Sequence, residues 1–341
     1  MKKNLLITCL GLAVLLIYAC KKDNILDPET EETEQTEPDP EIPDDPGDTD
    51  DDDLNTNSQT INYENAILIA FSSNSATVTN PFENNGVVVE NNNGHIVITS
   101  TVSGSELNYV LSGITADGSV KIYGEEKFGL VLNGVGITNP SGAAINIQNK
   151  KKGVVTVVAQ TNNRLIDGLT YTYTDGEDMK TTFFSEGNVE VGGNGTLEIR
   201  GKNKHGLCTD GALTITAGTI HIKEAASDGI HANDEITISG GTLTVRSTGD
   251  GIESESKKAP TSITAGDVTI VTTGEKGHAI KTKYNVEIAT TGNIEITTYG
   301  AASKGIKPSG DITILKGTVA VNTAGDAIWD TDDSDVSSAA G

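Results

Sequence analysis

From residue 183 onward, apolar residues alternate with Thr, Ser or charged residues in short blocks that recur along the chain. Four of these blocks read LTITAGTIHI, ITISGGTLTV, VEIATTGNIEI and ITILKGTVAV. Alternation with a period of two is typical of a β-strand with one buried face, and a Gly-containing bend divides each block into two halves. The pattern predicts pairs of short strands, and no helix longer than a turn or two is expected after the first 20 residues.

An anchor tripeptide accompanies each block. The anchors are His205-Gly206-Leu207, Asp228-Gly229-Ile230, Asp250-Gly251-Ile252, His278-Ala279-Ile280, Lys304-Gly305-Ile306 and Asp326-Ala327-Ile328. Their third positions are separated by 23, 22, 28, 26 and 22 residues, and Phe184 fits one step before Leu207. A unit of this length is too short for a propeller blade. We therefore predict an all-β fold, a right-handed parallel β-helix with coils of about 22 residues, in which stacked coils bury ladders of apolar side chains.

Weaker coils of the same kind precede the repeat. Short apolar strands broken by Gly and Asn occupy residues 126–160, and strand-like segments over residues 60–125 could include an N-terminal cap. The β-helix domain is predicted to span residues 55–341, with insertions such as KKAPTS at 257–262 placed in turns. Residues 330–341 stop where another coil would begin, so we expect a truncated last coil.

The first 54 residues predict a secretion signal followed by a linker. Lys2 and Lys3 precede an apolar run that ends near Cys20, which is typical of a secretory signal over residues 1–20. Cys20 stands where a bacterial lipobox carries its lipidated residue, and acyl chains would anchor the protein stably. An ordinary signal peptide is the alternative. Residues 21–54 are an acidic linker that cannot bury a core. We expect a lipid-anchored protein at the bacterial outer membrane or cell surface.

Charge narrows the choice of partners. The formal net charge is -24, and the first 54 residues hold 16 acidic and 4 basic side chains, so half of the negative charge lies in the N-terminal stretch. Such a chain repels nucleic acid and attracts cations. Once Cys9 is removed and Cys20 is lipidated, Cys208 has no partner, which excludes a disulfide framework and predicts a buried or half-buried thiol.

Several segments make the domain resemble a known family. They are YVLSG, LVLNGVGIT, GAAINI, DGEDMK, FFSEG, KHGLCTDG and SDGIHANDEITISGG. The chain from about residue 61 resembles secreted bacterial carbohydrate-binding parallel β-helix proteins. Known members have a fold like that of polysaccharide lyases, carry calcium, and bind pectin-type polysaccharide without demonstrated cleavage. The resemblance implies the same fold, calcium as a cofactor, and a polysaccharide partner of a polygalacturonate-like kind.

Carboxylates recur in the repeat. Stacked coils would bring Asp228 and Asp250 to about 5 Å, where two charges repel by about 3 kcal/mol at an effective dielectric constant of 20. A shared cation relieves this repulsion, and hard oxygen ligands favour calcium over zinc. Together with the resemblance, this predicts calcium ligands among Asp210, Asp228, Asn233, Asp234, Asp250 and Glu253. The alternative is that Asp before Gly only bonds nearby backbone amides in a turn.

A second acidic cluster, DGEDMK at 175–180, follows Tyr171 and Tyr173. Three interpretations stay open for it: a small calcium site, a loop held against the coils, and a solvated surface loop. The only tryptophan is Trp329, and this scarcity of aromatic platforms favours an acidic glycan over a neutral one.

Lysines near the carboxylates suggest how such a glycan is bound. The proposed ligand-binding residues are Lys276, Lys281, Lys304 and Lys307, and two of them, Lys281 and Lys307, align in one column with Cys208, His231 and Glu253. The function predicted is non-catalytic binding of acidic polysaccharide by a calcium-stabilised, monomeric lipoprotein. The alternatives are a calcium-dependent lyase of the pectate-lyase type, with a Lys as base, and a structural or adhesive stalk.

Overall fold

The structure, a computed structural model, describes residues 63, 65–177 and 179–328, which belong to one compact unit. The predicted signal peptide 1–20, Cys20, the linker 21–54 and Trp329 lie outside the described residues. Within the described part, every regular element is a strand, and no helix is long and apolar enough to cross a membrane.

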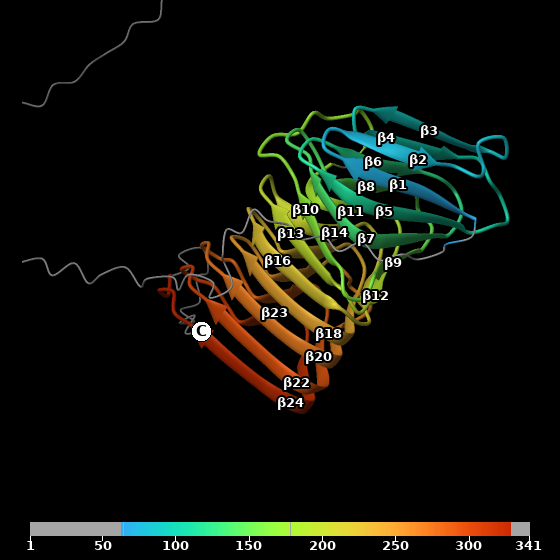
Figure 1. Cartoon of the computed structure of the whole chain (residues 1–341). Coiled ribbons are helices and arrows are strands. Elements are labelled where there is room, and N and C mark those ends of the chain that lie inside the picture. The colour runs from blue at the N-terminus through green and yellow to red at the C-terminus, as the bar shows by residue number, and fades with distance from the viewer. Residues whose placement is uncertain (1–62, 64, 178, 329–341) are drawn as a thin grey trace, which may run out of the picture. The chain divides into compact units, whose positions relative to one another are not determined.

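Two sheets of mostly parallel strands stack coil upon coil (Figure 1). Sheet A contains β1 (Ala66–Ser72), β2 (Ser75–Thr79), β5 (Leu107–Thr115), β7 (Phe128–Thr138), β9 (Gly153–Val157), β10 (Asn162–Ile166), β12 (Val189–Gly193), β13 (Thr196–Gly201), β15 (Leu213–Ile215), β16 (Thr219–Ala225), β18 (Ile236–Ser247), β20 (Thr261–Thr272), β22 (Val286–Thr298) and β24 (Ile312–Thr323). Sheet B contains β3 (Val87–Asn92), β4 (His95–Ser100), β6 (Ser119–Tyr123), β8 (Ile145–Gln148), β11 (Thr181–Ser185), β14 (His205–Thr209), β17 (Ile230–Ala232), β19 (Ile252–Ser254), β21 (Ile280–Thr282) and β23 (Ile306–Pro308).

The strand register confirms the parallel β-helix and most of the predicted repeat. Leu207, Ile230, Ile252, Ile280 and Ile306 each pair with the next across neighbouring strands of sheet B. The solenoid makes about nine turns, with coils of about 25 residues, longer than predicted because insertions lengthen particular turns. One assignment was wrong by a residue. The partner of Leu207 is Phe183, whereas Phe184 pairs with Cys208 on the opposite face of the strands.

Glycine bends let sheet A wrap around two sides of each coil. The first half of β18 pairs with β15 and the second half with β16, and Gly241 lies between the halves with a φ of 80°. A Cβ atom there would lie 2.5 Å from the carbonyl oxygen of Gly218, in the coil below. Glycine is required on both counts, since L-residues rarely adopt this φ and the backbones stack too closely for a side chain.

The N-terminal coils begin with hairpins. Antiparallel pairs join β1 to β2 and β3 to β4, and β2 and β3 form the outer edges of their sheets. This agrees with the cap suggested by residues 60–125. Because a hairpin ends the parallel stacking, it covers part of the first coil.

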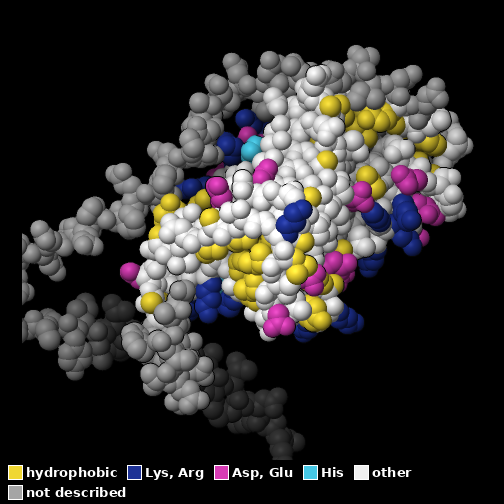
Figure 2. All heavy atoms as spheres, turned by 90° about the horizontal axis from the view of Figure 1, so that it is seen from below, with side chains coloured by type: hydrophobic (Ala, Val, Ile, Leu, Met, Phe, Trp, Pro, Cys, Tyr) yellow, Lys and Arg dark blue, Asp and Glu magenta, His cyan; other side chains and the backbone are white. Residues whose placement is uncertain are grey.

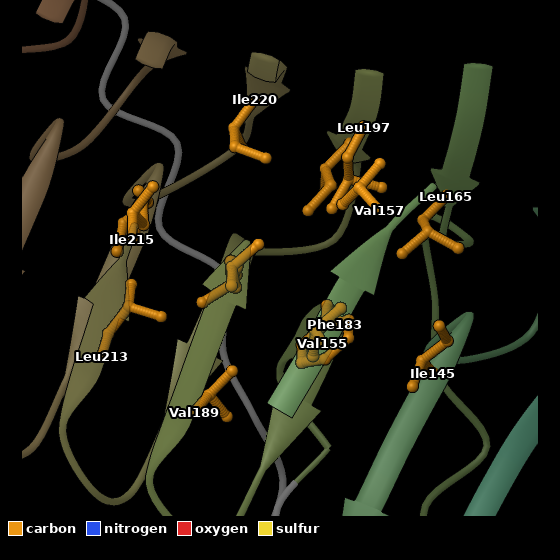
Figure 3. Packing of buried hydrophobic residues seen from close by; sticks show 14 of the residues in the cluster. Ile145, Val155, Val157, Leu165, Phe183, Val189, Leu197, Leu213, Ile215 and Ile220 are labelled. Atoms are coloured by element: carbon orange, nitrogen blue, oxygen red, sulfur yellow. The ribbon is translucent and has the colours of Figure 1, made fainter. Parts of the chain in front are cut away.

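Apolar side chains from both sheets fill the interior (Figure 3). Val155, Val189 and Leu213 point inward from sheet A, and Ile145 and Phe183 from sheet B, all at most 2% exposed. Each coil contributes one layer, and stacking buries a ladder that a single coil could not bury alone. The interior is therefore occupied by structural side chains, and chemistry must lie on the outer faces and turns.

Candidate functional site

Two columns of side chains run across the coils on sheet B. The outer column occupies one outward-facing position of successive strands, and the register aligns Lys121, Asn146, Phe184, Cys208, His231, Glu253, Lys281 and Lys307 in it. The anchor column occupies the first position of the first five anchor tripeptides: His205, Asp228, Asp250, His278 and Lys304. Cys208 is buried, as expected, and the predicted alignment of His231, Glu253, Lys281 and Lys307 is confirmed.

Four of the five anchor side chains, those of His205, Asp228, Asp250 and His278, accept a hydrogen bond from the backbone N–H of the next anchor. The N–H of Asp250 donates to Oδ1 of Asp228 over 2.9 Å, and the N–H of His278 donates to Oδ1 of Asp250 over 2.8 Å. Nδ1 of His278 accepts the N–H of Lys304 at 3.0 Å. The turn interpretation of Asp-Gly is thus partly right, but the bonded amide belongs to the following coil. These bonds satisfy backbone donors that burial would otherwise leave unpaired.

The remaining atoms of the two columns form a chain of ion pairs. Oδ2 of Asp228 lies 3.1 Å from Nδ1 of His205 and 3.5 Å from Nδ1 of His231. His231 Nδ1 lies 3.1 Å from Oε2 of Glu253. Nζ of Lys281 then bridges Oε1 of Glu253 at 2.6 Å and Oδ2 of Asp250 at 2.8 Å. The cation that the stacked carboxylates share here is therefore a lysine ammonium.

Burial and the neighbouring charges shift the pKa values of the side chains in this chain of ion pairs in opposite directions. Burial would lower the pKa of His231, but hydrogen bonds to Asp228 and Glu253 raise it to about 9. Burial lowers the pKa of His205 despite its contact with Asp228. Burial also opposes ionisation of Asp228, yet its contacts with His205 and His231 hold its pKa below the usual range. At neutral pH His231 is thus the cation between Asp228 and Glu253, and His205 is neutral.

The last coils carry an excess of positive charge. Lys304 and Lys307 are exposed, and within the described part of the chain neither forms an ion pair with a carboxylate. Burial, followed by the charges of Lys307 and Lys281, lowers the pKa of His278 to about 4. Elsewhere, on the face that Figure 2 presents, acidic and basic side chains are interspersed. The end of the outer column is therefore a local cationic surface, which we call the lysine end (Lys304 and Lys307).

The structure brings only some of the predicted metal ligands together. Asp228, Asp250 and Glu253 place one oxygen each within 4.8 Å of one another. Asp210 and Asn233 instead pair with each other, with Nδ2 of Asn233 donating to Oδ1 at 2.9 Å. The side chain of Asp234 is exposed and belongs to neither of the two potential metal-ligand groups among the described residues.

The histidines of the chain of ion pairs were missed as a site. A second group of potential ligands, His205, Asp228 and His231, also lies within 4.8 Å. The spacing of the anchors and the alignment of the outer column were the available signals. They did not reveal that Asp228 in the anchor column and His231, three positions later in the outer column, would come into contact.

Calcium does not fit the carboxylate group as its side chains stand. Calcium prefers six to eight oxygen ligands. Here Oδ1 of Asp228 and Oδ1 of Asp250 accept backbone N–H groups, and Lys281 bridges Asp250 and Glu253. A calcium ion would have to displace this ammonium, so calcium at these residues stays a prediction.

The acidic loop at 175–180 lies against the coils. Glu177 pairs with Nζ of Lys121 at 2.6 Å and also accepts a hydrogen bond from the hydroxyl of Tyr123. Met179 and Tyr171 are buried with Ala143 in a separate apolar cluster. Of the three interpretations, these contacts favour a loop held in place, while Asp178 lies outside the described residues.

A hollow of about 900 Å³ lies on another part of the surface, beside the ends of β4, β6 and β8. Among its lining residues are Tyr123, Glu126, Asn149, Lys150 and Lys151. It offers side chains of both charges and is the rival location for a bound saccharide.

Among the other predicted ligand-binding lysines, Lys276 is exposed. Its Nζ lies 3.7 Å from Oε1 of the neighbouring Glu275.

Comparison with known proteins agrees with the fold. A solved structure of the polysaccharide lyase-like protein from C. thermocellum, in a gadolinium derivative, superposes with a TM-score of 0.64. It is 25% identical, and the match covers 75% of this chain and 99% of that one. A carbohydrate-binding domain-containing protein of Acetivibrio thermocellus is 31% identical over 144 residues, which is 41% of this chain and 50% of the relative. The family model for carbohydrate-binding domain-containing proteins matches residues 92–339. The chain belongs to this carbohydrate-binding domain family.

Proposed function

We propose that the protein binds a polysaccharide that carries carboxylates, and that the lysine end of sheet B recognises those carboxylates. Membership of the carbohydrate-binding domain family supports carbohydrate binding in general. The acidic character of the ligand rests on one observation, the exposed cationic surface of Lys304 and Lys307 on a chain whose net charge is -24. A cationic surface on an acidic protein selects anionic ligands by complementarity.

The rest of the chain of ion pairs explains why recognition is assigned to these two lysines. Hydrogen bonds to Asp250 and Glu253 outweigh burial and raise the pKa of Lys281, so its ammonium is held by two carboxylates. Lys304 and Lys307 have no such partner among the described residues and can pair with a ligand without losing an existing ion pair. Exposed ion pairs are individually weak, so affinity would come from repeated contacts along the polymer.

The experiment is co-sedimentation of the full chain with insoluble polygalacturonate and, in parallel, with an uncharged glucan. Preferential binding to polygalacturonate that weakens with added salt supports the proposal. Equal binding to both polymers contradicts the acidic specificity, although carbohydrate binding would stand. Absence of binding to either polymer contradicts the proposal and favours the stalk.

A second candidate function, cleavage of the polymer by β-elimination, is favoured by Lys307. Nδ1 of His278 accepts a backbone N–H, so a neutral His278 carries its proton on Nε2, 3.0 Å from Nζ of Lys307. Lys307 would have to be uncharged for this second function, because only an uncharged amine can accept this proton, whereas recognition of a carboxylate uses its ammonium form. Burial and the charges of Lys281 and Lys304 also lower the pKa of Lys307, which favours the uncharged amine. A lysine with a lowered pKa suits a general base that removes a proton next to a carboxylate. Ultraviolet absorbance of the unsaturated product, followed during the same incubation, would rise for a lyase and stay flat for a binder.

The proposal also includes a bound calcium ion and the location of the protein in the cell. Calcium would enter at Asp228, Asp250 and Glu253 by displacing Lys281. The signal-like residues 1–20, Cys20 and the acidic linker support a lipid-anchored domain held at the bacterial outer membrane or cell surface. Labelling with a radioactive or clickable fatty acid, lost in a Cys20→Ser variant, tests the anchor.

A further inference from the structure

The contacts of His205 cannot all be satisfied by a neutral imidazole. The backbone N–H of Asp228 donates to Nδ1 of His205 over 3.3 Å, so this nitrogen presents a lone pair. The same nitrogen lies 3.1 Å from Oδ2 of Asp228, which also presents lone pairs. If the nitrogen carried a proton for the carboxylate, the backbone donor would lose its acceptor. A cation between Nδ1 and Oδ2 would be attracted by the lone pairs of both atoms, and it would replace the long hydrogen bond of 3.3 Å from the backbone N–H of Asp228.

The neighbouring imidazole completes a three-ligand arrangement. Nδ1 of His231 lies 3.5 Å from the same Oδ2 atom, and the two imidazole rings have centroids 5.1 Å apart. Zinc bonds of about 2.0–2.2 Å place tetrahedral ligand atoms roughly 3.3–3.5 Å apart. The two measured separations, 3.1 and 3.5 Å, lie around that spacing.

We propose that His205, Asp228 and His231 form a binding site for a zinc ion that joins two successive coils. Two imidazoles and one carboxylate are a donor set suited to zinc, and they leave a fourth coordination position for water or an exogenous ligand. His231, whose side chain is 13% exposed, gives the site access to solvent. Calcium, which prefers oxygen, does not compete well for imidazole nitrogens.

Surrounding contacts allow a metal to enter without leaving a carboxylate unpaired. Oδ1 of Asp228 keeps its bond from the N–H of Asp250, and Oδ2 faces the metal. Glu253 loses its contact with His231 but keeps the ammonium of Lys281 at 2.6 Å. Unlike calcium at the carboxylate group, zinc here displaces no lysine. It replaces the proton that His231 holds between Asp228 and Glu253, and this proton passes to solvent. The inference is independent of the proposed carbohydrate binding.

The test is zinc titration calorimetry on the full chain after removal of bound metal with a chelator, without added calcium, because the proposed calcium site shares Asp228 with the zinc site. Cys9 and Cys20 are replaced by Ser in every sample so that their thiols contribute nothing. We expect one zinc ion per chain. Loss of a hydrogen-bond partner behind a ligand weakens metal affinity by about 10–100-fold, so loss of the ligand itself in His231→Ala should weaken it by about 100-fold or more. His95→Ala is the matched control, because His95 forms a comparable pair with Asp117, at 3.2 Å, in another coil.

Equal zinc affinity in His231→Ala, or no zinc binding by the parent chain, would overturn the inference and leave a chain of ion pairs alone. If the variant fails to fold, zinc-edge X-ray absorption on the loaded parent chain decides. Scattering from two imidazoles supports the site, and its absence contradicts it.

Discussion

Oδ1 of Asp228 accepts a hydrogen bond from the backbone N–H of Asp250, 2.9 Å away and one coil further along the solenoid. The same relationship joins Asp250 to His278 and His278 to Lys304. A side chain at the start of one anchor thus fixes the start of the next. The recurrence of a carboxylate or an imidazole at this position follows, because both provide an acceptor to a buried donor.

Replacing Asp228 tests this relationship. We expect Asp228→Ala to lower the free energy of unfolding by about 3 kcal/mol, because it leaves a buried N–H unpaired and removes a charge from a buried ion pair. Asp228→Asn also removes the charge but retains the acceptor, so it should cost about 1 kcal/mol less than Asp228→Ala. Urea unfolding followed by circular dichroism measures both. Equal losses in the two variants would show that the backbone bond contributes little.

Stacked glycine bends predict a steric effect. Gly241→Ala places a Cβ atom 2.5 Å from the carbonyl oxygen of Gly218, at a φ of 80°. Gly104→Ala has a similar φ of 73° but no atom within 4 Å of the new Cβ, so it isolates the backbone strain. We expect losses of about 1 kcal/mol for Gly104→Ala and about 3 kcal/mol for Gly241→Ala. Similar melting temperatures for the two variants would contradict the close packing of coils at this bend.

The lowered pKa of His278 makes the stability of the fold depend on pH. Its folded-state pKa is about 4, below the ordinary 6.5, so the unfolded chain binds the proton first as the pH falls. His278 therefore contributes stability above pH 6.5 that is lost as the pH decreases towards 4. His278→Asn keeps an acceptor for the N–H of Lys304 but does not titrate. The melting temperature of the parent chain should fall more steeply than that of the variant over this range, and parallel curves would refute the assignment.

Lys281 makes the calcium proposal testable. Removing its ammonium leaves Asp250 and Glu253 without the cation that bridges them. We expect Lys281→Ala to be less stable than the parent without calcium and to bind calcium more tightly, by about tenfold or more, because no ammonium has to be displaced. Calorimetric titration with calcium gives both affinities. Unchanged affinity would place any bound calcium away from these carboxylates.

The repeat made the fold predictable, and its limits explain what was missed. Alternation and the anchor spacing determine which residues face inward, so the pairing of Leu207 with Ile230 could be read from the sequence. The 38-residue step from Ile145 to Phe183 has no equivalent in the later coils, and it obscured the register there. The side chains of Asp210 and Asn233 bond to each other, and Lys281 supplies the shared cation. Such choices among polar partners depend on distances of a few tenths of an ångström, which periodicity does not determine.

The most direct test of the central claim compares two double lysine variants in binding to polygalacturonate. Lys304→Ala with Lys307→Ala removes the lysine end, whereas Lys150→Ala with Lys151→Ala removes the same charge from the rival hollow. Each exposed ion pair contributes up to about 1 kcal/mol, so the first variant should bind about tenfold more weakly than the parent and the second should bind equally. Full affinity in the Lys304 and Lys307 variant, with loss in the other, would move the carbohydrate site to the hollow and contradict the account.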